Sequence, residues 1–329
     1  MRTLMIAPSW LGDAIVSHTL IQKIQLQHNS TVDVVCRSYL KPIYAMMSGV
    51  KNIYPTNDST GHLNLKEKRQ LANTLKGKYD QAFILPHNIK SALIPWLAKI
   101  PNRIGWRGEC RFGLINHAQK KRHIGNQTIV EYANLLRING KVDEFENCLK
   151  PHLVLPKYKM PSELINTSYI ILAPGASFGA SKCWPVESFK TLGMLLIRKG
   201  FKIVLLGSKN DQTIAKKINL PTKDCINLTG VIDLVTATGI LNQSKLLVSN
   251  DAGLMHVAAA LDKPIVAMFG PTALDKAPPL STNATILSLN LSCQPCQQKT
   301  CPLTYRRCLD ELHPNTVFDH VMRRLECVS

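Results

Sequence analysis

The sequence has no uninterrupted run of the ~18–20 apolar residues that a membrane-spanning helix requires, although 45% of its 329 residues are hydrophobic. It has no low-complexity tract, and its first residues lack the apolar region and small-residue cleavage site of a signal peptide. These absences predict a globular, cytoplasmic protein. Its ten cysteines are then expected to be reduced unless they bind a metal.

Two common nucleotide-binding motifs are also missing. The first predicted strand is not followed by G-x-G-x-x-G, and G-x-x-x-x-G-K-[ST] occurs nowhere in the chain. Both motifs place glycine-rich backbone against phosphates, so their absence disfavours a nicotinamide-dependent enzyme and a P-loop nucleotidase.

Acidic side chains are scarce: 22 Asp and Glu stand against 40 Lys and Arg, which gives a formal net charge of +18. The excess is uneven, because residues 1–160 hold 23 basic and 10 acidic side chains, whereas residues 161–329 hold 17 and 12. A basic first half predicts an anionic partner, which could be nucleic acid, anionic lipid or a phosphorylated substrate.

The order of the expected elements predicts an α/β fold with two Rossmann-like domains, residues 1–160 and 161–329. The first half opens with a strand, a loop up to Asp13, a helix over 14–27 and a second strand. The same alternation restarts after residue 160. The boundary is placed there because three prolines surround a short apolar run, Pro151, Pro156 and Pro161.

Residues 246–271 predict an anion site. They form two short apolar runs, typical of buried parallel strands, separated by a polar corner and a short helix. Asn250 and Asp251 can cap that helix, and Gly253 allows a ligand to approach its first turn closely. The helix amides would bind an anion at the carboxyl edge of the sheet. An ordinary capped helix with a core histidine is the alternative.

Charged residues in the first half are candidates for an anion-binding site. Three arginines recur at four-residue intervals, and the glycines between them favour a loop. With Lys90 they could cradle phosphate or carboxylate groups, because Arg binds both with two parallel hydrogen bonds. A solvated basic surface is the alternative. The arginines are Arg103, Arg107 and Arg111.

Four of the ten cysteines form a cluster with the spacing C-x2-C-x4-C-x6-C. Such a cluster in a reduced protein indicates a small structural zinc site, although only one pair has the spacing of a standard zinc ribbon. Free thiols or disulfides are the alternative. The cluster consists of Cys293, Cys296, Cys301 and Cys308.

Five segments in order along the chain carry a family resemblance: PSWLGDA (8–14), LPHNIKSALIPWLAKIPNRIGWRGE (85–109), APGASFGASKCWP (173–185), LLGSKND (205–211) and NDAGLMHVAAAL (250–261). Together they resemble the heptosyltransferases of glycosyltransferase family 9, which use ADP-heptose. The resemblance implies a GT-B fold, with an acceptor-binding and a donor-binding Rossmann-like domain facing each other across a cleft. It also suggests that the closing helix packs back on the first domain.

The implied reaction is an inverting transfer of L-glycero-D-manno-heptose from ADP-heptose to the first heptose of the lipopolysaccharide inner core on lipid A. The alternatives are transfer at another core step, a GT-B-type sugar-nucleotide epimerase, and a nucleic-acid binder. The last has no RNA-binding signature to support it. The resemblance also implies an enzyme peripherally associated with the anionic inner membrane surface, with no cofactor required for catalysis.

The resemblance assigns roles to individual residues. Asp13 would be the general base and Lys182 the lysine that stabilises departing ADP. Many relatives carry Ser or Thr where this chain has Ala252, so one hydroxyl contact to phosphate is missing. The donor residues would be Asp211 at the ribose, Ile232 at adenine, and Asp251, Ala252, Gly253, Leu254 and His256; the acceptor residues would be Lys90, Arg103, Arg107 and Arg111.

Overall fold

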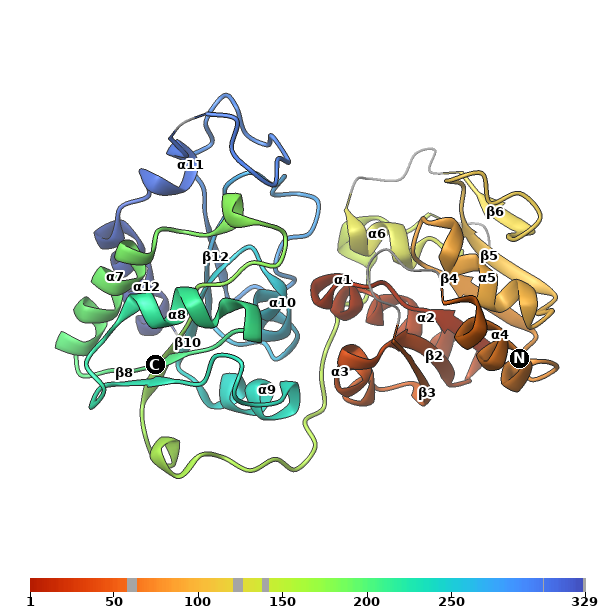
Figure 1. The fold of residues 1–329 in the computed structure, drawn as a ribbon, viewed down its shortest axis with the longest axis horizontal. Coiled ribbons are helices and arrows are strands. Elements are labelled where there is room, and N and C mark those ends of the chain that lie inside the picture. The colour runs from red at the N-terminus through yellow and green to blue at the C-terminus, as the bar shows by residue number, and fades with distance from the viewer. Residues whose placement is uncertain (58–63, 121–126, 138–141, 304, 328–329) are drawn as a thin grey trace. The chain divides into compact units, whose positions relative to one another are not determined.

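The computed structural model describes residues 1–57, 64–120, 127–137, 142–303 and 305–327. The chain divides into two compact units, Met1–Val154 and Leu155–Ser329, each built on a six-stranded sheet (Figure 1). The division falls within the proline-containing segment from which the domain boundary was placed. The α/β fold with two Rossmann-like domains is confirmed; the cleft between them stays a prediction.

The first sheet has the order β3-β2-β1-β4-β5-β6, with every pair of neighbours parallel. The residues of its two central strands are all buried, which explains their continuous apolar character. The strand order reverses between β1 and β4, where ligands of such sheets bind. The strands are β1 (Thr3–Ile6), β2 (Val32–Arg37), β3 (Val50–Thr56), β4 (Gln81–Ile84), β5 (Asn102–Trp106) and β6 (His117–Gln119).

The predicted helix over 14–27 is instead two helices, which meet at Ser17. The Ser17 hydroxyl donates to the Ala14 carbonyl at 2.7 Å, and this local bond competes with regular helix pairing. The first helix begins at Leu11, so Asp13 lies in its first turn rather than in a loop. The helices of this unit are α1 (Leu11–Val16), α2 (His18–His28), α3 (Lys41–Ala45), α4 (Leu65–Leu75), α5 (Ile89–Leu97) and α6 (Thr128–Ala133), with η1 (Ser38–Leu40) and η3 (Phe145–Asn147) as 3-10 turns.

The second sheet repeats this topology, in the order β12-β11-β10-β7-β8-β9. All its neighbouring strands are parallel, and the order reverses between β7 and β10. The predicted anion site follows β10 and therefore lies at this reversal point. The strands are β7 (Tyr169–Ala173), β8 (Lys202–Leu205), β9 (Cys225–Asn227), β10 (Leu246–Asn250), β11 (Ile265–Met268) and β12 (Ala284–Leu287).

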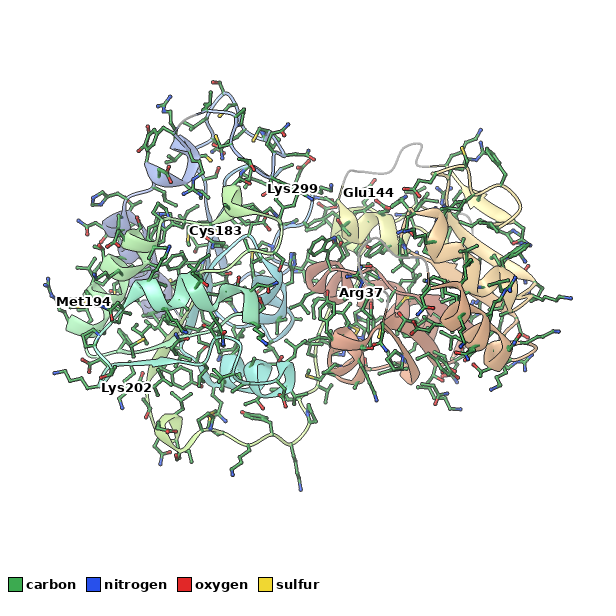
Figure 2. The ribbon with its side chains drawn as sticks, in the orientation of Figure 1. Arg37, Glu144, Cys183, Met194, Lys202 and Lys299 are labelled. Carbon is green, nitrogen blue, oxygen red and sulfur yellow. The ribbon has the colours of Figure 1, made fainter. Side chains whose placement is uncertain are left out.

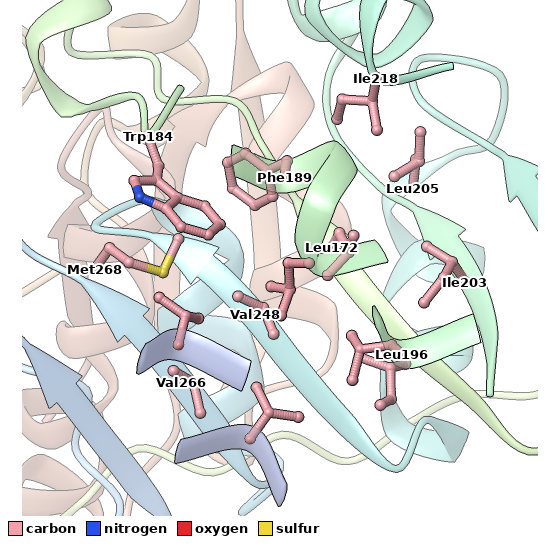
Figure 3. Close-up of a cluster of buried hydrophobic side chains, with 14 of the residues drawn as sticks. Leu172, Trp184, Phe189, Leu196, Ile203, Leu205, Ile218, Val248, Val266 and Met268 are labelled. Atoms are coloured by element: carbon pink, nitrogen blue, oxygen red, sulfur yellow. The ribbon is translucent and has the colours of Figure 1, made fainter. Parts of the chain in front are cut away.

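One core holds the second unit together on one face of its sheet (Figure 3). Trp184 and Phe189 pack edge to face, with ring centroids 5.0 Å apart. The closing helix, α12 (Pro314–Glu326), buries Val317 and Val321 against this sheet and packs on α7 (Val186–Arg198). Its return to the first domain stays a prediction. The other helices are α8 (Gln212–Ile218), α9 (Leu234–Gln243), α10 (Gly253–Ala260) and α11 (Arg307–Asp310), with the 3-10 turns η4 (Ser162–Leu164), η5 (Ala180–Lys182) and η6 (Lys209–Asp211).

None of the helices in the described part of the chain is both long enough and apolar enough to traverse a lipid bilayer.

Candidate active site

The predicted donor residues lie at the carboxyl edge of the second sheet. Lys182 ends η5 in the loop after β7, Asp251 directly follows β10, and His256 lies in α10. These two strands flank the reversal of strand order. Separate sequence motifs are therefore brought to one place by the sheet topology.

Lys182 and Asp251 form an ion pair. The lysine Nζ donates to Asp251 Oδ2 at 2.5 Å, and the Thr272 hydroxyl donates to the same oxygen at 2.5 Å. The two charged side chains are only 13% and 10% exposed. The ammonium also lies 4.9 Å from the centre of the Phe178 ring. This cluster holds a positive charge in a sheltered position, where it acts more strongly than in water.

Sequence reasoning missed Thr272 and Phe178. Thr272 follows β11, which neighbours β10 in the sheet, and the register pairs Asn250 with Met268. Its hydroxyl comes from the carboxyl end of the next strand in space, and only the strand order could have identified it. Phe178 lies between the glycines of the loop after β7, where it resembles an ordinary loop residue.

His256 is buried beside this pair. Burial lowers its pKa to about 4, while the Asp251 charge acts to raise the pKa and the Lys182 charge to lower it. The imidazole is therefore neutral at pH 7. A neutral imidazole can donate one hydrogen bond and accept another without adding charge to the site.

The predicted capping of α10 by Asn250 or Asp251 is wrong. The N-cap residue is Ala252, which makes no side-chain cap. The Asp251 carboxylate bonds to Lys182 and Thr272, while Asn250 accepts from the Trp184 amide at 2.9 Å and donates to the Pro174 carbonyl at 2.8 Å. With an alanine at the cap, the amides of the first turn, from Gly253 and Leu254, remain suited to a bound anion.

The remaining donor candidates follow the edge of the sheet outward from β7. Asp211 belongs to η6 after β8, and its Oδ2 accepts from the amide and the hydroxyl of Ser208, both at 2.7 Å. Gly175 packs against it, since a Cβ there would lie 2.1 Å from Asp211 Cγ. Ile232 is half-buried in the turn between β9 and α9. The candidates thus occupy successive strand ends, which suits an extended nucleotide.

Asp13 lies at the reversal point of the first sheet. It is half-buried in the first turn of α1, whose N-cap is Trp10. Its charge contributes to the raised pKa of three tyrosines, although burial is the larger cause for each: Tyr39, Tyr44 and Tyr132. The carboxylate therefore stands among phenols at the carboxyl edge of the sheet.

The structure does not bring the acceptor candidates together as one cradle. Arg103 is the second residue of β5, so the loop predicted around Gly105 is wrong. Arg107 directly follows the strand, four residue steps or about 13 Å along the extended chain from Arg103. The Arg103 guanidinium donates to the carbonyls of Ile100, Gly113 and Leu114 at 2.6–3.2 Å.

Arg111 is buried, which lowers the pKa of its guanidinium. It donates to the Pro86 carbonyl at 2.7 Å and to the Trp106 carbonyl. It therefore ties together the loops after β4 and β5. Arg107 and Lys90 are exposed at the same carboxyl edge, and they are the two candidates placed to meet an external anion.

The carboxyl edge of the first sheet also contains a side-chain contact that sequence reasoning missed. His87 follows β4, and its Nε2 contacts Glu131 Oε1 of α6. The two residues are 44 positions apart in sequence. They meet because α6 returns to the edge of the sheet. No local sequence pattern indicates this contact.

Comparison with known proteins identifies the family. The model of glycosyltransferase family 9 (heptosyltransferase) matches residues 68–306. The chain belongs to glycosyltransferase family 9. This family 9 chain is 36% identical to lipooligosaccharide heptosyltransferase 2 of Haemophilus ducreyi, over 88% of this chain and 89% of that protein. It is 34% identical to lipopolysaccharide heptosyltransferase 2 of Salmonella typhimurium, over 95% and 98%. The structure of Escherichia coli ADP-heptose LPS heptosyltransferase II superposes with a TM-score of 0.85 at 32% identity, covering 99% of both chains.

The four cysteines of the predicted zinc site lie in residues 293–308 of the second unit. All four cysteines are free, and the described residues contain no group of three or more His, Cys, Asp or Glu arranged to hold a metal ion. The thiols are nevertheless neighbours. Burial raises the pKa of Cys308, and the charges of Cys293, Cys301 and Cys296 raise it further. Structural zinc stays a prediction.

Proposed function

We propose that this family 9 glycosyltransferase transfers L-glycero-D-manno-heptose, with inversion, from ADP-heptose to the first heptose of the lipopolysaccharide inner core. The observation that carries the proposal is the Lys182–Asp251 pair beside the start of α10. A sheltered ammonium and helix amides at the reversal point of the sheet together suit a diphosphate. The similarity to lipopolysaccharide heptosyltransferase 2 and to ADP-heptose LPS heptosyltransferase II supports the choice of donor and acceptor.

In the proposed reaction, the acceptor hydroxyl oxygen attacks the anomeric carbon of the donor heptose. The bond from that carbon to the diphosphate oxygen breaks, and its electron pair leaves with ADP. Asp13 accepts the proton of the hydroxyl, and Lys182 with the amides of Gly253 and Leu254 stabilises the charge that builds on ADP. Asp251 and Thr272 hold the ammonium in place, and neutral His256 donates or accepts a hydrogen bond.

The test uses purified protein, ADP-heptose and lipopolysaccharide acceptors truncated at defined steps, with products identified by mass spectrometry. The expected product is a two-heptose core from a one-heptose acceptor. Addition of heptose only to a heptose-free acceptor would show that the enzyme adds the first heptose of the core instead of the second. Conversion of ADP-heptose to an isomer without acceptor would support the epimerase instead.

We also propose that the first unit binds an anionic membrane surface. Three large apolar side chains are exposed at the carboxyl edge of its sheet, two in loops and one at the start of α5, and Lys90 and Arg107 lie at the same edge. Exposed aromatic and basic residues together suit the interface of an anionic bilayer. The apolar side chains are Trp10, Ile89 and Phe112, exposed by 54%, 42% and 91%.

Vesicles with and without anionic lipid test this proposal. Binding should need anionic lipid and weaken as salt rises, because exposed charges are screened over about 10 Å at 0.1 M. The Phe112→Ser variant should bind more weakly, whereas Leu26→Ser, equally apolar and exposed on α2 away from the edge loops, should bind like the wild type. Equal binding to neutral vesicles would contradict the proposal.

We also propose that the four clustered cysteines hold a structural zinc ion. Zinc quantification on protein purified without chelator tests this proposal. One zinc per chain, lost in Cys296→Ser, would support a structural site. Retained thermal stability after exhaustive chelation, with no zinc released, would leave the four thiols free.

A further inference from the structure

The loop that carries Lys182 is fastened to the cysteine-rich segment, which we define as residues 293–312. Buried Ser181 donates from its hydroxyl to the Gln298 carbonyl at 2.6 Å. The two backbones approach so closely at Gly179, where φ is +152°, that a Cβ would lie 2.7 Å from the Lys299 carbonyl oxygen. Figure 2 labels Cys183 of the loop and Lys299 of the segment.

Arg306 makes the central contact between the two segments. Its Nη1 donates to the carbonyls of Ala180 and Cys183, at 2.5 and 2.8 Å. Its Nη2 donates to Asp310 Oδ1 at 2.8 Å, which fixes the guanidinium from the opposite side. The two carbonyls stand on either side of Lys182 in the chain. A single planar side chain therefore clamps the turn that presents the lysine.

Trp184 completes the fastening. Its indole Nε1 donates to the Leu312 carbonyl at 2.9 Å, and its ring is buried in the core. Its backbone amide is held by Asn250 at the end of β10. The backbone on both sides of Lys182 is thus fixed, and the lysine side chain alone extends to Asp251.

We infer that Arg306 is a positioning residue for Lys182, acting on the donor diphosphate only through that lysine. The inference rests on the proposed function, because that function gives Lys182 its role at the phosphates. A lysine stem is long and flexible, so its ammonium keeps one position only when its tip and its backbone are both held. Asp251 holds the tip, and Arg306 holds the backbone on both sides. Displacement of a binding group by 1 Å can cost about 10²-fold in rate. The Arg306 guanidinium binds the two carbonyls through Nη1 and Asp310 through Nη2, and a single ammonium reproduces this pair of separate donors poorly.

The experiment compares Arg306→Ala and Arg306→Lys with Arg307→Ala, measuring ADP affinity by calorimetry and kcat and KM with ADP-heptose. Arg307 is a matched control, since it is the adjacent arginine and its guanidinium pairs with Glu311 at the surface. Arg306→Ala should weaken ADP binding about tenfold, Arg306→Lys somewhat less, and Arg307→Ala less than twofold. Ser181→Ala should give a smaller loss than Arg306→Ala.

The decisive measurement repeats Arg306→Ala in a Lys182→Ala background. If Arg306 acts through Lys182, the second substitution should then change ADP affinity less than twofold. Equal losses in both backgrounds, or wild-type affinity in both Arg306 variants, would overturn the inference. If Arg306→Ala does not fold, the same comparison is made with Arg306→Lys. Wild-type protein that binds no ADP would contradict the proposed function and not the Arg306 clamp.

Discussion

The two sheets of this enzyme have the same strand order, but their reversal points carry different chemistry. A carboxylate, Asp13, stands among tyrosines at the first. At the second, Lys182 is paired with Asp251 beside a helix start that has no side-chain cap. Topology provides equivalent positions in both units, and the residue types at those positions decide which can accept a proton and which can receive an anion.

The largest expected effect is at Asp13, where one substitution separates proton acceptance from anion binding. Asp13→Asn should lower kcat about 10²–10⁴-fold with unchanged ADP affinity, because the amide cannot take the acceptor proton. The N-cap of α1 is Trp10, so loss of helix capping by Asp13 would not explain such an effect. Asp80→Asn, in an exposed ion pair of the same unit, is the control. A stable Asp13→Asn variant with a near-normal rate would leave the base unassigned.

Lys182→Ala should impair the reversal point of the second sheet, where we propose that the donor binds. We expect kcat/KM for ADP-heptose to fall about 10²–10³-fold and ADP to bind more weakly, because the lost charge faces a leaving group that becomes more negative. Lys199→Ala, an exposed lysine at the end of α7, controls for net charge. Unchanged kcat/KM in Lys182→Ala would remove this residue from the donor site.

Each unit also buries one histidine whose pKa is lowered to about 4, mainly by burial: His18 in the first and His256 in the second. Between the unfolded pKa of 6.5 and about 4, the unfolded chain binds a proton that the folded chain does not, so stability falls as pH falls. At pH 5 the cost is about 2 kcal/mol per histidine.

Denaturant unfolding of His18→Gln and His256→Gln between pH 7 and pH 4.5 checks this prediction. Each variant should lose less stability than the wild type on acidification, and each should affect its own unit. If the free energy of unfolding of both variants falls with pH as steeply as that of the wild type, other groups control acid unfolding.

The smallest effect is expected at Thr272. Thr272→Val keeps the shape and removes the hydroxyl that holds Asp251, so kcat/KM should fall about tenfold. Thr272→Ser should retain most of the activity because it keeps the donor. If valine and serine behaved alike, the hydroxyl would have no part in positioning the ion pair.

The sequence predicted what local patterns determine. Continuous apolar runs marked the central strands, and the polar corner at Asp251 was expected directly after one of them and lies there. It could not predict contacts made between distant elements. Thr272 reaches Asp251 from the next strand in space, and Glu131 reaches His87 from a helix that returns to the sheet.

The errors came from element boundaries. Arg103, Arg107 and Arg111 have even spacing, but β5 extends from Asn102 to Trp106 and directs them to different places. In the sequence alone, Gly105 favours a loop. In the strand, a Cβ at this position would lie 3.1 Å from the Ile84 carbonyl oxygen, so the glycine allows a close approach to β4.

The burial of Trp184 makes the loop optically observable. The chain has four tryptophans, and Trp184 is the one that belongs to the second unit. Trp10 and Trp96 are exposed by 54% and 46%, so an aqueous quencher such as iodide reaches them, while Trp106 and Trp184 are enclosed. The emission that survives iodide therefore comes from one fixed indole in each unit. With Trp106 replaced by Phe, that emission would report on the residue two positions from Lys182, so the loop can be followed by fluorescence without an attached dye.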